Sequence, residues 1–320
     1  MDYSLLREKV ERAGILSKSP LRYVPYFLGI LVCIAFGLWV LTQIDNYLLL
    51  ILDGVFLGLV FAQSAFLGHD IAHKQVFRSP FWQQIIGTFW FSALFGASMR
   101  WWTGKHDLHH AHPNELGMDP DAHIPFSFSP EHLATFTGMY RRIADHQRAL
   151  FPIMLSLARA SSWWSSIRDF FQKHDRTAVV EATLFVVHFA LYFYFIFYFL
   201  PFTAGVFFVL LVFFVQSINL GLAFAPNHKG MPILPNGTSL DFITRQITTA
   251  RNISPSMFMD FLYGGLNYQI EHHLFPTIPR HNLRRAREIV KEFCGAYHFT
   301  YHEVGPLQSL QEIYQSFYST

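Results

Sequence analysis

The sequence predicts an all-α integral membrane protein with four transmembrane helices, arranged as two hairpins, and a cytoplasmic helical cap. Three observations support this prediction. Mean hydropathy is +0.24 and only 14% of the 320 residues are charged, whereas a soluble domain of this length carries far more charge. Four stretches reach the ~20 apolar residues that a helix needs to cross a hydrocarbon core of ~30 Å. The 17 histidines include clusters close to the ends of these stretches.

The four expected spans lie at about 26–44, 48–67, 178–200 and 203–225. The first and fourth contain no charged residue, the second contains only Asp53, and the third contains Glu181 and His188. A short polar loop joins the first pair, and Pro201 separates the second pair. Each pair is therefore expected to form a hairpin with a tight turn.

Lysines and arginines are distributed unevenly along the chain. They precede the first span, occupy the region between the hairpins and follow the last span, whereas the tight turns contain none. The positive-inside rule then places both termini and the middle region in the cytoplasm. We expect a cytoplasmic amphipathic segment at 1–25, a membrane domain at 26–295 and a cytoplasmic tail at 296–320.

Seven histidines form three clusters with the spacing of metal ligands. Residues three or four apart share one face of a helix. Imidazole suits iron, zinc or copper, and seven such ligands exceed what one tetrahedral zinc ion takes. We therefore expect two metal ions. The histidines are His69, His73, His106, His109, His110, His272 and His273.

A fifth apolar stretch, 81–99, is also long enough to span. If it crossed the membrane, the second histidine cluster would lie on the opposite side from the first. Because one metal centre needs all three clusters on the same side, we predict that 81–99 is an interfacial or re-entrant segment.

The clusters resemble the three histidine boxes of the membrane-bound fatty acid desaturases. They read HDIAH at 69–73, HDLHH at 106–110 and QIEHH at 269–273. The context GGLNYQIEHHLFP, with Gln269 where many relatives have histidine, is similar to the front-end, linoleoyl-CoA desaturase-like subgroup. That subgroup inserts a double bond between an existing one and the carboxyl end. The resemblance covers about 25–295.

The resemblance implies an oxygen-dependent diiron enzyme that introduces a cis double bond into a long-chain acyl group. It adds His228, in APNHKG, to the ligands, and it implies two iron ions with O2 as co-substrate. The chain has no His-Pro-Gly-Gly haem motif and no room for a fused b-type cytochrome before the first span. We therefore expect a separate ferredoxin or free cytochrome with an NAD(P)H reductase, a pattern more typical of a bacterial cytoplasmic membrane with a cytoplasmic active site.

Several polar residues are candidates for supporting roles. Metal-bound histidines usually donate their second N–H to a carboxylate or carbonyl, so we expect such partners among residues next to the boxes. Gln216 and Asn219, near the end of the fourth span, are candidates for lining a substrate tunnel, or alternatively for hydrogen bonding between helices. The candidate partners are Asp70, Asp107, Gln269 and Glu271, with Asp119 and Asp121 as further possibilities.

Other functions remain open at this point. Hydroxylation or another oxidation on the same diiron scaffold is the nearest alternative, and a zinc-dependent membrane hydrolase is a distant one, because HDIAH lacks the glutamate of HExxH. The acyl group would be carried by coenzyme A, a lipid or an acyl-carrier protein. A net charge of +2 gives no support for a nucleic-acid partner. Cys33 and Cys294 are expected to be free thiols.

Overall fold

The computed structural model describes residues 3–122 and 124–318. The chain is mostly helical, as the sequence predicts, and it divides into two compact units. The spanning unit comprises 18–103 and 155–221, and the histidine unit comprises residues up to Ser17, 104–154 and 222 onward. Each unit is considered separately below.

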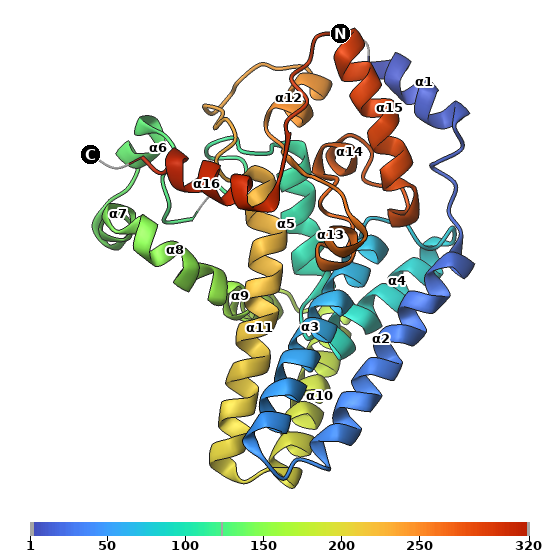
Figure 1. The fold of residues 1–320 in the computed structure, drawn as a ribbon, viewed down its shortest axis with the longest axis vertical. Coiled ribbons are helices and arrows are strands. Elements are labelled where there is room, and N and C mark those ends of the chain that lie inside the picture. The colour runs from blue at the N-terminus through green and yellow to red at the C-terminus, as the bar shows by residue number, and fades with distance from the viewer. Residues whose placement is uncertain (1–2, 123, 319–320) are drawn as a thin grey trace. The chain divides into compact units, whose positions relative to one another are not determined.

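The spanning unit contains the long apolar helices (Figure 1). Four helices of the described chain are long and apolar enough to cross a membrane, which confirms the predicted number. They are α2 (Pro20–Leu41), α3 (Tyr47–Ala72), α10 (Arg176–Phe199) and α11 (Phe202–His228), the last ending in the histidine unit. The unit also holds α4 (Pro80–Phe89), the π-helix η1 (Trp90–Phe95), the start of α5 (Met99–Ala111) and α9 (Ala158–Gln172).

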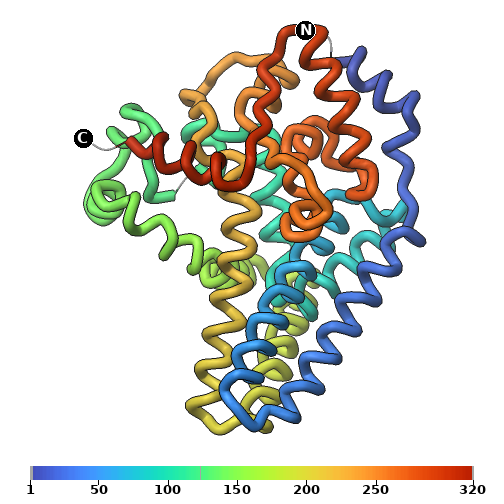
Figure 2. Tube along the Cα trace, viewed as in Figure 1, coloured from blue at the N-terminus to red at the C-terminus, as the bar shows by residue number. Residues whose placement is uncertain are grey.

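Local signals begin these helices and small residues let them pack. The Asn46 side chain accepts a hydrogen bond from the Leu49 amide at the start of α3, and Asp175 caps α10 in the same way. Gly54 and Gly58, one turn apart on α3, lie so close to α11 that a Cβ atom would stand 2.7 Å from its side chains. The turns after α2 and after α10 lie at the same end of this unit, so the two hairpins point the same way (Figure 2).

The fifth apolar stretch folds as an α-helix that continues directly into a short π-helix. α4 has ten residues and η1 has six, which together rise about 24 Å at 1.5 Å per residue, less than the ~30 Å hydrocarbon core. Gly96, at φ 72°, ends η1 in the left-handed region that favours glycine. This geometry agrees with an interfacial or re-entrant segment, which stays a prediction.

The histidine unit is built from shorter elements. Two-residue strands β1 (Asn252–Ile253) and β2 (Glu303–Val304) pair in parallel. α1 lies alongside α15 (Figure 1), and their apolar faces share a core that includes Leu6, Val10 and Phe293. Its helices, besides the ends of α5 and α11, are α1 (Tyr3–Arg12), α6 (Pro130–Ala134), α7 (Gly138–Asp145), α8 (Gln147–Ser156, ending in the other unit), α12 (Phe242–Thr248), α13 (Met257–Leu262), α14 (Gln269–Leu274), η2 (Arg280–Asn282), α15 (Leu283–Ala296) and α16 (Pro306–Ser316).

Helix boundaries differ from the expected spans at both kinds of end: α2 runs from Pro20 to Leu41 rather than over 26–44, and two helices extend further at their histidine ends. α3 continues through His69 to Ala72, and α11 continues past Pro226 to His228. His73 and His228 therefore lie at the ends of continuous helices. Both cysteines are free, as expected.

Candidate metal centre

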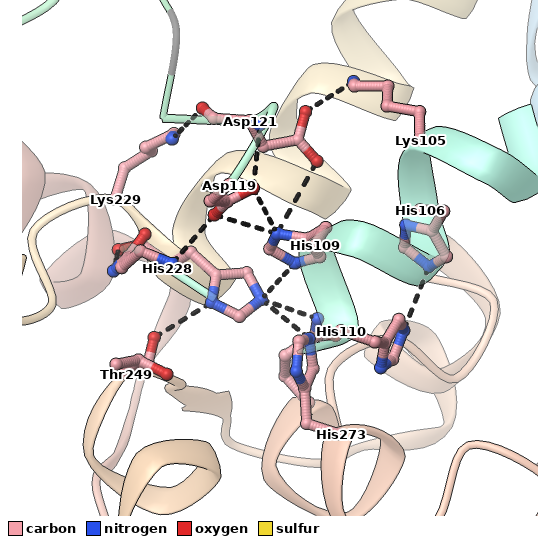
Figure 3. A network of polar contacts seen from close by, with 12 residues as sticks. Lys105, His106, His109, His110, Asp119, Asp121, His228, Lys229, Thr249 and His273 are labelled. Carbon is pink, nitrogen blue, oxygen red and sulfur yellow. Dashed lines mark hydrogen bonds and ion pairs between the residues drawn. The ribbon is translucent and has the colours of Figure 1, made fainter. Parts of the chain in front are cut away.

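Three helices of the histidine unit supply six of the predicted ligands. α5 carries His106, His109 and His110 at i, i+3 and i+4, α11 ends at His228, and α14 carries His272-His273. Figure 3 shows several of these rings facing one another. Five of the six are buried, and His110 is partly buried.

The Nε2 atoms of His109, His228 and His273 converge on one point. The Nε2 atom of His228 lies 3.2 Å from that of His109 and 3.0 Å from that of His273. The three residues have ligand atoms close enough together to hold one metal ion. The separate segments 104–111, 222–228 and 269–274 thus meet at a single buried site.

The opposite nitrogen of each ring fixes its tautomer. The Nδ1 atom of His109 lies 3.0 Å from an Asp119 oxygen, that of His228 lies 2.9 Å from the Thr249 carbonyl, and that of His273 lies 2.9 Å from Gln246 Oε1 (Figure 3 shows the first two).

Each of these partners accepts hydrogen bonds, so each Nδ1 carries the proton and each Nε2 presents a lone pair. The His228 lone pair lies about 3 Å from each of the other two, which is unfavourable without a cation between them, and this arrangement fits a metal ion.

Electrostatics favour the protonation states that a metal site needs. Burial and the neighbouring histidines hold the pKa of His273 well below its usual range, so the ring stays neutral, as a metal ligand must. Burial opposes ionisation of Asp119, but the hydrogen bond from His109 together with the charge interactions of His109 and Lys229 outweighs it, and the pKa of this carboxyl falls below its usual value. Asp119 is therefore an anion that holds His109 in place.

The remaining box histidines are distributed between the two units. In the histidine unit the His106 and His110 Nε2 atoms lie 3.1 Å apart, and the His110 and His272 ring centroids lie 4.8 Å apart. In the spanning unit, His69 and His73 are buried one turn apart at the end of α3, with ring centroids 4.5 Å apart.

The end of α3 is sharply defined. Lys74, at φ 59°, leaves the helix in the left-handed region, and the Gln75 amide bonds back to the Asp70 carbonyl. This is a helix C-terminal motif of the Schellman kind. It ends the helix directly after His73 and fixes the position of this ring pair.

The predicted supporting residues have different environments. Asp70 lies 3.8 Å from His69 Nδ1, and Asp107 is exposed, without a recorded hydrogen bond to a histidine among residues 3–122 and 124–318. Glu271 is fully buried and accepts hydrogen bonds from Asn252 and Tyr301 rather than from a ring, and burial raises its pKa to about 7. Asp119 hydrogen-bonds to the His109 ring, and Asp121 pairs with Lys105 and lies 3.7 Å from the same His109 Nδ1 atom.

Gln216 and Asn219 lie on the part of α11 that belongs to the spanning unit. Gln216 accepts a hydrogen bond from the guanidinium of Arg159, which is 1% exposed. It also lines a narrow cavity with Arg159, Trp163, His188 and Tyr192. Asn219 is buried, and its Oδ1 atom has no hydrogen-bond partner among the described residues. Hydrogen bonding between helices thus accounts for Gln216, and its role as a tunnel residue stays a prediction.

Comparison with known proteins gives this site its context. The family described as "Fatty acid desaturase" matches residues 45–305, which include all three boxes and His228. The chain belongs to this family. It is 31% identical to the "Acyl-lipid (9-3)-desaturase" of Physcomitrium patens over 95% of this chain and 59% of that protein.

Two nematode desaturases show similar likeness. The chain is 31% identical to the "Delta(6)-fatty-acid desaturase" and 32% identical to the "Delta(5) fatty acid desaturase" of Caenorhabditis elegans, over 93% and 91% of this chain and 70% and 67% of those proteins. The chain thus spans about three fifths to seven tenths of these relatives. All three are eukaryotic and give the expected bacterial origin no support.

Several residues that build this desaturase site were not singled out from the sequence. Gln246 bridges the site, since its Oε1 meets His273 and its Nε2 donates to the His110 carbonyl. Thr249 contributes only its carbonyl, and Asn252 bonds to both Glu271 and the Ile270 amide. No spacing rule identifies such residues. Asn227 stands beside His228 in the sequence, but its hydrogen bond to Gln269 could not be predicted from that position.

Proposed function

We propose that this chain is an oxygen-dependent fatty acyl desaturase in which eight of the 17 histidines hold two iron ions. The observation that carries the proposal is the convergence of the His109, His228 and His273 lone pairs, each fixed by a partner at Nδ1. The remaining box histidines, His69, His73, His106, His110 and His272, are proposed as ligands of the second ion on the strength of their spacing.

Two iron ions with dioxygen would supply the oxidant that removes hydrogen from an unactivated methylene, which no amino-acid side chain can do. The overall balance is one –CH2–CH2– unit, O2, two electrons and two protons giving one cis –CH=CH– unit and two waters. The chain's own residues hold the histidines in the metal-binding tautomer, and burial keeps bulk water away from the site. The electrons come from a separate carrier.

The front-end class is proposed for the position of the new double bond. Its support is Gln269 in the third box, together with similarity to proteins named as Delta(6)- and Delta(5)-desaturases. The acyl carrier is coenzyme A, a lipid or an acyl-carrier protein. The active site and both termini are proposed to be cytoplasmic, on the basis of the lysine and arginine distribution.

The test is product analysis in a host that expresses the chain with an electron-transfer system. Cells are fed saturated, monounsaturated and polyunsaturated acids, and the fatty acids are analysed by gas chromatography–mass spectrometry, with His272→Ala and His228→Ala as controls. A new double bond on the carboxyl side of an existing one, absent from both controls, is the expected result. A new bond in saturated acids alone contradicts the front-end class, and an oxygenated product favours a hydroxylase.

A further inference from the structure

We infer that Gln269 is not a metal ligand but a hydrogen-bond donor, which points its side-chain N–H at the position where a small anion would bind beside the metal. This inference rests on the proposed metal centre and assigns a role to the one box position that is not histidine. Gln269 is the first residue of α14 and is buried. Its Nε2 atom lies 2.9 Å from His228 Nε2.

The orientation of the Gln269 amide is fixed by Asn227. Asn227 Nδ2 donates one hydrogen bond to the Ala223 carbonyl, one turn earlier on α11, at 2.9 Å. The same nitrogen donates to Gln269 Oε1 at 3.1 Å. Because the Ala223 carbonyl only accepts, Asn227 must present its nitrogen on this side. Gln269 therefore turns its oxygen to Asn227 and its nitrogen to the histidines.

The opposite orientation loses hydrogen bonds on both sides. If the Gln269 amide were reversed, its nitrogen would face the nitrogen of Asn227, and two donors would meet. If Asn227 were reversed as well, its oxygen would face the Ala223 carbonyl. The present orientation makes all three hydrogen bonds and leaves the Asn227 oxygen without a partner among the described residues, whereas each reversal loses two of the three, which is costly in a buried site.

This orientation has a consequence for coordination. An amide NH2 group has no lone pair to give a metal ion, so His109, His228 and His273 are the protein ligands at this point. A metal ion takes at least four ligands, which leaves a position for an exogenous ligand. The Gln269 nitrogen lies 2.9 Å from His228 Nε2, so a ligand bound at this cluster of histidines would be within its hydrogen-bonding reach. A donor so placed strengthens binding of an anion.

The experiment compares iron content and azide binding in Gln269→Leu, Asn227→Leu and the double variant. Gln269→Leu is expected to retain the iron content of the parent protein, while its azide dissociation constant rises about tenfold or more, the usual effect of losing a hydrogen bond to a charged group. Asn227→Leu is expected to raise this constant by a smaller factor, because the amide is no longer held. The double variant should match Gln269→Leu alone, since both changes act through one donor.

The matched control is Gln83→Leu. Gln83 is a buried glutamine of α4 whose amide atoms have no hydrogen-bond partner among the described residues, and its replacement should leave iron content and azide binding unchanged. Loss of iron in Gln269→Leu would show that Gln269 is a ligand. Unchanged azide binding in either single variant would contradict the role of Gln269 as an oriented hydrogen-bond donor. A different result would contradict the proposed metal centre itself: a His228→Ala variant that retains the iron content of the parent protein.

Discussion

Each converging histidine depends on the group that accepts its Nδ1 proton. For His109 this group is Asp119, which is fully buried and also accepts hydrogen bonds from the Asn114 and Asp121 amides. A carboxylate in this position orients the ring and makes the distal nitrogen a better ligand. A short loop after the second box therefore fixes the orientation of one proposed metal ligand.

Replacing Asp119 by Asn should weaken iron binding, with the fold retained. An amide oxygen still accepts from His109, but the negative charge is lost, and changes of this kind typically cost about tenfold to a hundredfold in metal affinity. Competition with a chelator measures the affinity. Asp107→Asn is the matched control, because Asp107 is exposed on the same α5 helix. An equal effect of both changes would mean that general electrostatics, rather than the Asp119–His109 contact, is responsible.

The sequence indicates which histidines lie together on a helix face better than it indicates the residues that hold their rings. Box spacing is local, so His106, His109 and His110 can be assigned to one helix face from their order alone. Asp119 was considered only as a possible partner, and Glu271 was expected to support a ring but bonds to Asn252 and Tyr301. These contacts depend on how distant segments pack. The Asn227–Gln269 bond, across 42 residues, is of the same kind.

At the scale of elements, Arg159 of α9 joins three pieces of the spanning unit. Its guanidinium donates to the Phe95 and Gly96 carbonyls at the end of η1 and to Gln216 on α11, and it lies 3.9 Å from the Phe95 ring centroid. Burial lowers the pKa of Arg159 to about 9, which still leaves it charged at neutral pH. The charge faces the carbonyl end of a helix, where a cation is favourable.

Arg159→Leu should destabilise the protein. The change leaves the carbonyls at the end of η1 and the oxygen of Gln216 without their donor, and we expect a loss of about 2–4 kcal/mol, the range for breaking a buried polar network. Thermal unfolding in detergent, followed by helix content, measures the shift in midpoint. Arg168→Leu, an exposed position on the same helix, is the control. Equal midpoints for the two variants would contradict the role of Arg159.

Hydropathy predicts the number of spanning helices better than their ends, since α2 begins at Pro20 rather than near 26. Hydropathy located four spans, but it did not show that α3 and α11 continue as helices to His73 and His228. The polar residues at these ends lower the local hydropathy, although helical hydrogen bonding continues. The change from α-helix to π-helix at Trp90 and the end of the segment at Gly96 depend on local packing and backbone conformation, which a window average of hydropathy does not detect.

At the scale of the whole molecule, iron should contribute to stability. The converging Nε2 atoms are close together without a cation, so metal binding favours the folded chain over the unfolded one. Chelation should lower the thermal midpoint, and added ferrous iron should restore it. His228→Ala should respond less to the chelator, because its site is already incomplete. A midpoint that does not change on chelation would contradict this coupling.

The sidedness of the chain gives the last prediction. If 81–99 does not cross the membrane, the residues before and after it lie on the same side. In a background with Cys33→Ala and Cys294→Ala, Arg78→Cys and Glu131→Cys should both react with an impermeant maleimide from the cytoplasmic side, since both positions are exposed. Gln43→Cys, exposed in the turn after α2, should react only from the opposite side. A crossing segment would instead place Glu131→Cys opposite Arg78→Cys, and the second histidine box could not then share a centre with the first.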